Sequence, residues 1–134
     1  MWLQPKKTKY KKMQKGKLTM FNYRSNILKF GCVGLKATKS GTMSSRHVEA
    51  ARQAIVRKLN RKGKMWIRVF PTIPITAKPT EVRMGKGKGN VSHWGVKVSA
   101  GTVLFEIDGV AKNIAISAFK TGGAKLPVRT AIQL

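Results

Sequence analysis

The sequence predicts an α+β fold: a two-layer sandwich of mostly antiparallel strands with two helices, plus a basic N-terminal arm and a long glycine-lysine loop. One long stretch repeats its apolar residues with the period of a helix, and several short stretches alternate as strands do. The strand-like stretches are mostly adjacent along the chain, which favours the α+β class. In a chain of 134 residues, we expect an extended arm at 1–17 and a single domain at 18–134.

Charge limits the partners that this chain can have. Its 28 Lys and Arg residues stand against four Asp and Glu, which gives a formal net charge of +24. Such self-repulsion weakens a compact state in isolation and favours binding to a dense polyanion. Nucleic acid is the first candidate and a membrane surface the second. No apolar run approaches the ~18 residues that span a bilayer, so we expect no transmembrane role.

The cysteine and histidine content argues against a metal site. Cys32 is the only cysteine, and His47 and His93 are the only histidines. An internal disulfide is therefore impossible, a reduced compartment is the simpler expectation, and no zinc-ligand spacing exists. We expect no cofactor. The N-terminus has neither the apolar core of a secretory signal nor the Arg/Ser-rich helix of a transit peptide.

The first element is the arm, MWLQPKKTKYKKMQKGK (residues 1–17), which contains seven lysines and no acid. It has no helical or strand period, so we expect it to be extended. Trp2, Tyr10 and Met13 interrupt the lysines, a pattern that suits stacking or packing on RNA. The alternative is a disordered tail that only improves solubility.

Residues 18–36 are expected to form β structure. A polar break at 24–26 divides the stretch, and Ile27, Val33 and Leu35 then fall on one alternating face. That face is the candidate core side of a strand.

The clearest helix is predicted from Ser45 to Lys62. Ser44 is the expected N-cap and Gly63 the expected terminator. An apolar stripe at helical spacing is formed by Val48, Ala51, Ile55 and Leu59. The opposite face carries Arg46, Arg57 and Arg61 with no Glu among them. We expect this face to contact phosphates; a merely solvated face is the alternative.

Strands are also expected at 65–70 and within 126–134. Ala100-Gly101 is predicted to be the two-residue turn of a hairpin, because three apolar pairs would then face one another: Val98 with Val103, Val96 with Phe105, and Trp94 with Ile107. Lys97 would lie diagonal to Glu106. After an Asp108-Gly109 turn, a short helix is expected at about 111–121, ended by Gly122-Gly123.

Between these strands, residues 71–92 show no period and are expected to form a protruding loop. Pro71, Pro74 and Pro79 withdraw amide donors there, and unstructured loops of this length are usually functional or disordered. The loop contains RMGKGKGN (83–90), whose alternating glycines fit neither a phosphate-binding loop nor a dinucleotide fingerprint. A flexible backbone that approaches a surface closely, with basic side chains for phosphates, is expected instead. A floppy linker is the alternative.

We expect no enzyme. Glu106 and Asp108 form the only closely spaced acidic pair, and a metal-dependent nuclease would need further oxygen ligands. Asp108 is better explained by its turn. Glu49 lies near the start of the helix, where a negative charge is favourable, and neither histidine has an evident acidic partner.

Several segments resemble one family. These are EAARQAIVRKLNRKGKMWIRVFP (49–71), PITAKP (74–79), VRMGKGKGN (82–90), LFEIDGV (104–110) and LQPKKTKYKKMQKGK (3–17). In this order and content they are similar to bacterial-type large-subunit ribosomal protein sixteen. The resemblance implies a structural constituent of the large subunit, which binds large-subunit rRNA, supports the aminoacyl-tRNA site and peptidyl-transferase region, and acts late in subunit assembly.

The resemblance also implies site residues and partners. The implied rRNA contacts are Lys6, Lys7, Lys9, Tyr10, Lys11, Lys12, Lys15, Lys17, Lys36, Arg46, Arg57, Arg61, Lys62, Lys64 and Arg68. The implied residues nearest the tRNA and peptidyl-transferase region are Arg83, Met84, Gly85, Lys86, Gly87, Lys88 and Gly89. The implied partners are rRNA, tRNA in the aminoacyl site and neighbouring ribosomal proteins, with no membrane and no small-molecule substrate.

Some features depart from the bacterial pattern. Ala111, Lys112 and Asn113 stand where acidic residues are usual, and Lys112 opposes the helix dipole. Residues 18–29 lack the usual glycine-rich basic composition. Few acids, many Lys, Asn and Ile, and no transit peptide suggest an organellar version, with a mitochondrion favoured over a plastid or a bacterial cytoplasm. The remaining alternatives are a non-ribosomal RNA chaperone or nucleoid-type protein, a cationic membrane-active protein and, last, a nuclease.

Overall fold

The computed structural model describes residues 3–134, so Trp2 lies outside the described residues. Seven strands and two helices confirm the α+β class. In chain order they are β1 (Val33–Ala37), β2 (Gly41–Ser44), α1 (Ser45–Lys58), β3 (Lys64–Ile67), β4 (Ile73–Ala77), β5 (Asn90–Val98), β6 (Val103–Asp108), α2 (Lys112–Gly123) and β7 (Thr130–Gln133).

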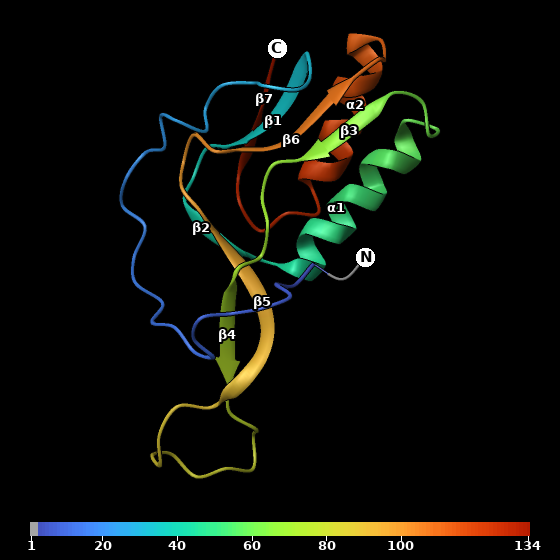
Figure 1. The fold of residues 1–134 in the computed structure, drawn as a ribbon. Coiled ribbons are helices and arrows are strands. Elements are labelled where there is room, and N and C mark those ends of the chain that lie inside the picture. Colours follow the sequence, from blue (N-terminus) through green and yellow to red (C-terminus); the bar gives the residue numbers. More distant parts are fainter. Residues whose placement is uncertain (1–2) are drawn as a thin grey trace.

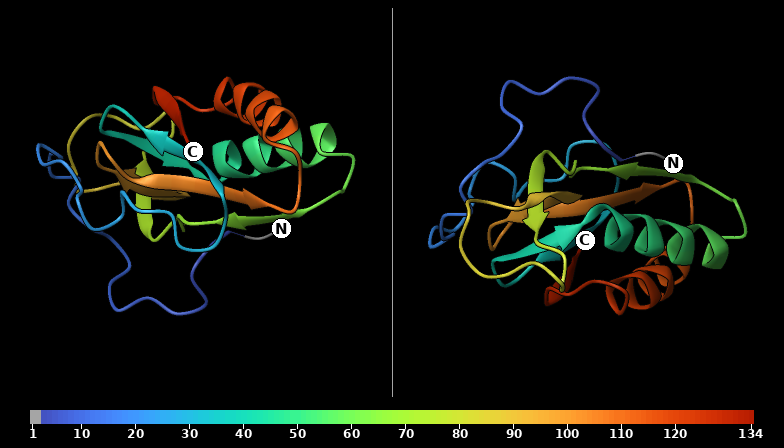
Figure 2. Two further views of the ribbon diagram at one scale, coloured as in Figure 1. Left: turned by 90° about the horizontal axis from the view of Figure 1, so that it is seen from above. Right: turned by 90° about the horizontal axis from the view of Figure 1, so that it is seen from below.

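The strands form two antiparallel sheets (Figure 1). A four-stranded sheet has the order β3-β6-β1-β7, and a three-stranded sheet has the order β2-β5-β4. The two helices lie side by side against one face of the four-stranded sheet (Figure 2). The three-stranded sheet extends away from the helices, and its β4–β5 hairpin projects farthest from the body (Figure 1).

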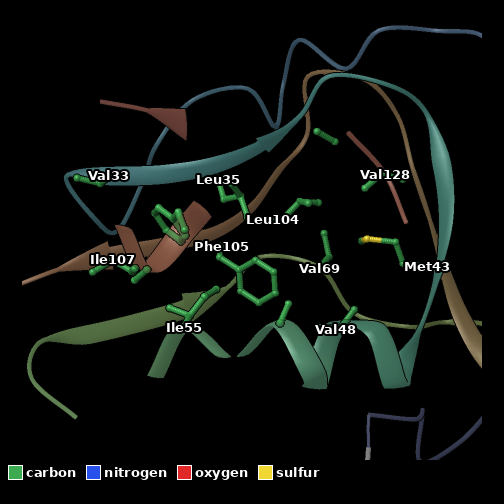
Figure 3. Packing of buried hydrophobic residues seen from close by; sticks show 14 of the residues in the cluster. Val33, Leu35, Met43, Val48, Ile55, Val69, Leu104, Phe105, Ile107 and Val128 are labelled. Carbon is green, nitrogen blue, oxygen red and sulfur yellow. The ribbon is translucent and has the colours of Figure 1, made fainter. Parts of the chain in front are cut away.

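The core lies between the helices and the four-stranded sheet. Ile55 of α1 lies beside Phe105 of β6, while Val48 points toward the side of Val69 and Met43 (Figure 3). The side chains of Val48, Ile55 and Phe105 are fully buried. Ala51 and Leu59 complete the predicted apolar stripe, with exposed fractions of 0% and 4%. The helical period therefore identified the buried face of α1 correctly.

The ends of α1 follow the prediction at one terminus only. Ser44 caps the helix: its side-chain oxygen accepts from the backbone N–H of His47 at 3.3 Å, and its own N–H donates to His47 Nδ1 at 3.2 Å. At the other end the helix stops at Lys58, four residues earlier than predicted. Asn60 and Arg61 adopt left-handed conformations, with φ of 50° and 61°. The turn is thus made before Gly63, which is not the terminator.

The predicted β5–β6 hairpin is wrong. A turn does occur at 99–102, where Thr102 N–H donates to Ser99 O at 3.2 Å, but the chain there passes from one sheet to the other. Val98 pairs with Gly41 of β2, whereas Phe105 pairs with Leu35 of β1 and Ile67 of β3. Val96 therefore does not face Phe105, Trp94 does not face Ile107, and Lys97 is not diagonal to Glu106. β5 pairs with β2 and β4, whereas β6 pairs with β1 and β3.

The predicted loop at 71–92 is largely part of a hairpin formed by β4 and β5. β4 pairs with β5 from Ile73↔Gly95 to Ala77↔Asn90, so only residues 78–89 connect the strands. Pro74 lies within β4, which is an edge strand and so tolerates the missing amide donor. The register shifts between Ile75 and Thr76, which marks a bulge or irregularity in the pairing.

Two other predicted boundaries are corrected. In residues 18–36 only Val33–Ala37 form a strand, and Ile27 is 64% exposed instead of sharing the buried face of Val33 and Leu35. Gly122 and Gly123 are the last two residues of α2, so the helix extends two residues beyond the predicted end at 121. A Cβ on Gly122 would lie 2.4 Å from Ile55 Cγ1, so glycine permits the close approach of α2 to α1.

Candidate nucleic-acid interface

The tip of the β4–β5 hairpin is an exposed part of the chain's basic surface. We call residues 83–88 the hairpin tip; all six are exposed, and Met84 is 97% exposed. Gly85 and Gly87 have φ of 92° and 85°, and a Cβ on either would meet nothing within 4 Å. Lys86 between them also has a positive φ, 51°. The tip therefore turns sharply in open space.

Gly89, at the base of the tip, has a different role. It is half-buried, and a Cβ there would lie 2.5 Å from the carbonyl oxygen of Ala77. The two strands consequently approach each other closely where the hairpin opens into its loop. Lys78 crosses this opening, and its ammonium group donates to the carbonyl oxygen of Gly85.

The N-terminal arm reaches the hairpin tip. Lys12 Nζ donates to the carbonyl oxygen of Lys88 at 2.8 Å, and Lys88 Nζ donates to the carbonyl oxygen of Met13 at 2.5 Å. Leu3, the first residue of the arm that the structure describes, is 6% exposed and belongs to the hydrophobic core. Between these anchors it loops away from the sheets (Figure 2). Two lysine-rich segments that are 76 residues apart in sequence are thereby brought together.

The arm side chains proposed as RNA contacts are all presented to solvent: Lys6, Lys7, Lys9, Tyr10, Lys11, Lys12, Lys15 and Lys17. The arm has no helix or strand between residues 3 and 17, as predicted. Lys9 Nζ lies 5.6 Å from the Tyr10 ring centroid. The cationic part of the arm, residues 6–17, is exposed throughout and has no helix or strand, which is the character expected of a phosphate-binding arm.

The solvent face of α1 forms a second basic surface. Arg46, Arg57 and Arg61 are exposed. A hollow of about 490 Å³ on this face is lined by Arg52, Gln53, Val56, Arg57, Asn60 and Arg61. Arg52 forms an ion pair with Glu49 at 2.7 Å, and its hydrogen bond lowers the pKa of the Glu49 carboxyl. The other arginines of this face form no ion pair within the described chain.

The remaining predicted contacts are placed separately. Lys62 and Lys64 are exposed near the start of β3, while Lys36 is half-buried within β1. Arg68 is directed inward, where it forms an ion pair with Glu106, whose side chain is fully buried. Its guanidinium charge is therefore already matched, in contrast to the charges of the arm and the hairpin tip.

Glu106 is the one buried acid among residues 3–134. Its carboxylate accepts the backbone N–H groups of Phe30 at 2.6 Å, Gly31 at 2.9 Å and Lys29 at 3.2 Å, as well as the Arg68 side chain. Burial, the largest single effect, raises the pKa of the carboxyl. The hydrogen bonds together outweigh burial and hold the pKa below its ordinary value. Glu106 therefore links the 29–31 segment to β6 and to Arg68.

Most of the positive charge of residues 3–134 is not compensated by ion pairs. Within residues 3–134 ion pairs join only Glu49 to Arg52 and Glu106 to Arg68. In the same part of the chain no three residues of the His, Cys, Asp and Glu types come close enough to hold a metal ion. Over these residues, too, no helix has both the length and the apolarity required to cross a membrane.

Comparison with known proteins assigns the sequence to a family. The family model described as ribosomal protein L16p/L10e matches residues 5–133. The protein named large ribosomal subunit protein uL16 of Halorhodospira halophila is 55% identical, over 96% of this chain and 93% of the relative. The proteins of the same name from Dichelobacter nodosus and Alkalilimnicola ehrlichii are 53% and 56% identical, over 98% and 96% of this chain and 96% and 93% of theirs.

Proposed function

Because this chain belongs to the ribosomal protein L16p/L10e family, we propose that it is a structural constituent of the large ribosomal subunit that binds large-subunit rRNA. Membership in a family of ribosomal proteins agrees with the expectation of a structural protein and not an enzyme. The single observation that supports rRNA binding best is the meeting of the arm and the hairpin tip through Lys12 and Lys88. Two like-charged segments held together need a polyanion to offset their repulsion.

We assign the two basic surfaces different parts of this task. The arm lysines and Arg46, Arg57 and Arg61 of α1 and its C-terminal turn neutralise rRNA phosphates, because these cations are exposed and form no ion pair within residues 3–134; Arg52 is excluded because it pairs with Glu49. The hairpin tip carries Arg83, Lys86 and Lys88 away from the body, and its glycines leave the backbone uncovered. It is the part of the chain best suited to reach tRNA in the aminoacyl site and the peptidyl-transferase region. A role late in subunit assembly remains part of the same proposal.

The tip assignment is tested with Lys86→Ala/Lys88→Ala in large subunits. We expect normal co-sedimentation with the subunit but impaired aminoacyl-tRNA accommodation, measured at matched occupancy of the protein. The control is Lys120→Ala/Lys125→Ala, which removes the same charge from exposed positions on and just after α2. Unchanged accommodation in the tip variant would refute the tip assignment while leaving rRNA binding intact.

Phosphate contact is tested with purified RNA. The logarithm of the association constant should fall linearly with the logarithm of salt concentration, with a slope of about −0.7 to −0.9 per neutralised phosphate. Removal of the arm at residue 17, or Arg46→Ala/Arg57→Ala/Arg61→Ala, should make the slope shallower. An affinity that is nearly independent of salt would refute this account.

The compartment is a separate proposal. The relatives named above are bacterial proteins, and the composition of this chain supports an organellar ribosome, with a mitochondrion favoured. Sedimentation of organellar and cytoplasmic lysates, with the protein followed by mass spectrometry, tests both the ribosome and the compartment. Co-migration with a large subunit supports the proposal; migration in light fractions or with DNA would favour an RNA chaperone or nucleoid-type protein.

A further inference from the structure

An exposed aromatic ring, Phe30, and a half-buried one, Trp66, lie together outside the arm and the hairpin tip, each with a cation near it. Phe30 is 54% exposed and stacks on Trp66 of β3, with ring centroids 6.0 Å apart and an interplanar angle of 21°. Lys64 Nζ lies 5.3 Å from the Trp66 centroid, and Arg68 Cζ lies 5.3 Å from the Phe30 centroid. We call these four residues the aromatic platform. Lys64 and Trp66 alternate along β3 and so share one face of the strand, and Arg68, which directly follows the strand, continues the same alternation.

Burial of Glu106 orders the platform. A buried carboxylate is costly unless it is fully hydrogen-bonded, and Glu106 meets this need with Arg68 and the backbone N–H groups of Lys29, Phe30 and Gly31. These contacts hold Phe30 beside Trp66, which is itself the register partner of Glu106. The backbone donor of Phe30 is thus engaged in the core, while its side chain remains exposed.

The two cations of the platform differ in mobility. Arg68 is held by its buried ion pair with Glu106. Lys64 is exposed and has no ion pair within residues 3–134, so its ammonium group is free to leave the Trp66 ring. When Lys64 leaves the ring, it uncovers the face of Trp66, and its ammonium group remains available to a partner at the surface.

We propose that the aromatic platform binds an unpaired nucleobase of RNA, which stacks on the Phe30–Trp66 pair while Lys64 moves to a neighbouring phosphate. This inference rests on the proposed RNA-binding function and adds a base-stacking site to it. Every nucleobase offers a flat face for stacking on aromatic side chains. Cations beside both rings, in a chain with a net charge of +24, complement a nucleotide better than the apolar surface of a partner protein.

The test compares three RNA probes on the full-length chain. They are a single-stranded oligonucleotide, an abasic oligonucleotide of equal length and charge, and a fully paired duplex. Phe30→Ala should weaken binding of the single-stranded probe by about fivefold or more, and should leave binding of the abasic probe unchanged. Phe30→Tyr should retain affinity because it keeps the ring. Met20→Ala, which removes another exposed apolar side chain from the same irregular segment, should have no effect.

A direct signal comes from Trp66 as the sole tryptophan. In Trp2→Phe/Trp94→Phe protein, the single-stranded probe should quench the fluorescence of Trp66, whereas the abasic probe should not. Phe30→Leu keeps the backbone donor to Glu106 and most of the apolar volume, so it separates a loss of stacking from a loss of folding. Its thermal midpoint should stay close to that of the unaltered chain.

Three outcomes would overturn the platform. Equal losses with the single-stranded and abasic probes would show that Phe30 acts only through the fold. No loss in Phe30→Ala would exclude stacking. Cross-linking of a photoreactive phenylalanine at position 30 to protein and not to RNA, in assembled subunits, would identify a protein partner instead. Weak, salt-insensitive binding of all three probes would be a different result, because it would refute the proposed function itself.

Discussion

Gly85 in the hairpin tip and Gly31 beside β6 occupy opposite environments. A Cβ on Gly85 would meet nothing within 4 Å, while its φ of 92° lies in the region that disfavours other residues. A Cβ on Gly31 would lie 2.6 Å from the carbonyl oxygen of Ile107, and its N–H donates to Glu106. One glycine permits a conformation in open space, and the other permits close packing. The hairpin tip is therefore shaped for contact with a partner, and the Gly31 segment for contact with the core.

Loss of the Glu106 carboxylate should have the largest effect on the packed region. Glu106→Gln removes the charge that compensates Arg68 and replaces one acceptor oxygen with a donor. We expect a loss of about 3–5 kcal/mol in the free energy of unfolding, measured by urea denaturation. Glu49→Gln, which breaks the partly exposed pair with Arg52, should cost less than about 1 kcal/mol. Equal losses in the two variants would contradict the distinction.

The two glycines themselves allow a matched comparison. Gly31→Ala should lower the free energy of unfolding by about 2–3 kcal/mol, because the new methyl group meets the β6 backbone, which cannot move aside. Gly85→Ala adds no clash, because a Cβ there meets nothing within 4 Å, so we expect only the strain of alanine at a positive φ, about 1 kcal/mol. Similar urea midpoints for the two variants would show that the tip is packed or that the Gly31 segment is loose.

Acid should destabilise the packed region through Glu106. Its pKa is lower in the folded than in the unfolded chain, so the unfolded chain binds more protons near the ordinary Glu pKa of about 4.3. The stabilisation is complete above that pH and is lost as pH falls through the lower, folded pKa. Glu106→Gln should remove this part of the pH dependence. Parallel curves of stability against pH for the variant and the unaltered chain would contradict the assignment.

Gly122→Ala should have the smallest effect on the packed region. Alanine gains about 1 kcal/mol in helix propensity over glycine, but the methyl group crowds buried Ile55 at a cost of about 1–3 kcal/mol. We expect a net loss of about 1 kcal/mol. In an Ile55→Ala background the crowding is removed, so Gly122→Ala should become neutral or stabilising. A double-mutant cycle measures this coupling.

Prediction from sequence succeeded where the signal is local. The apolar stripe of α1 identified Val48 and Ile55 as core residues, and Ser44 was recognised as an N-cap because capping involves residues three apart. The Asp108-Gly109 turn was also predicted, and Gly109 has a φ of 77°. Each of these features depends on residues that are close together in the sequence.

Prediction failed where the answer depends on distant partners. Alternation places Val98 and Phe105 on apolar faces but does not say which strand lies opposite, and here each pairs in a different sheet. β4 was missed because Pro74 interrupts it, which only an edge position permits. The burial of Glu106 depends on Lys29, 77 residues away. The aromatic platform likewise joins Phe30 to a strand 36 positions later, although the alternation of Lys64, Trp66 and Arg68 was a readable signal.

The irregular pairing between Ile75 and Thr76 lies between the body and the hairpin tip, where a bend changes the direction of the tip. β5 has nine residues, about 30 Å of strand at roughly 3.3 Å per residue, so the tip lies at the end of a long lever. A bulge bends a strand and increases its local twist, and everything beyond Thr76 turns with it. The direction in which the hairpin tip projects is therefore influenced by the pairing of two uncharged residues that lie outside the tip.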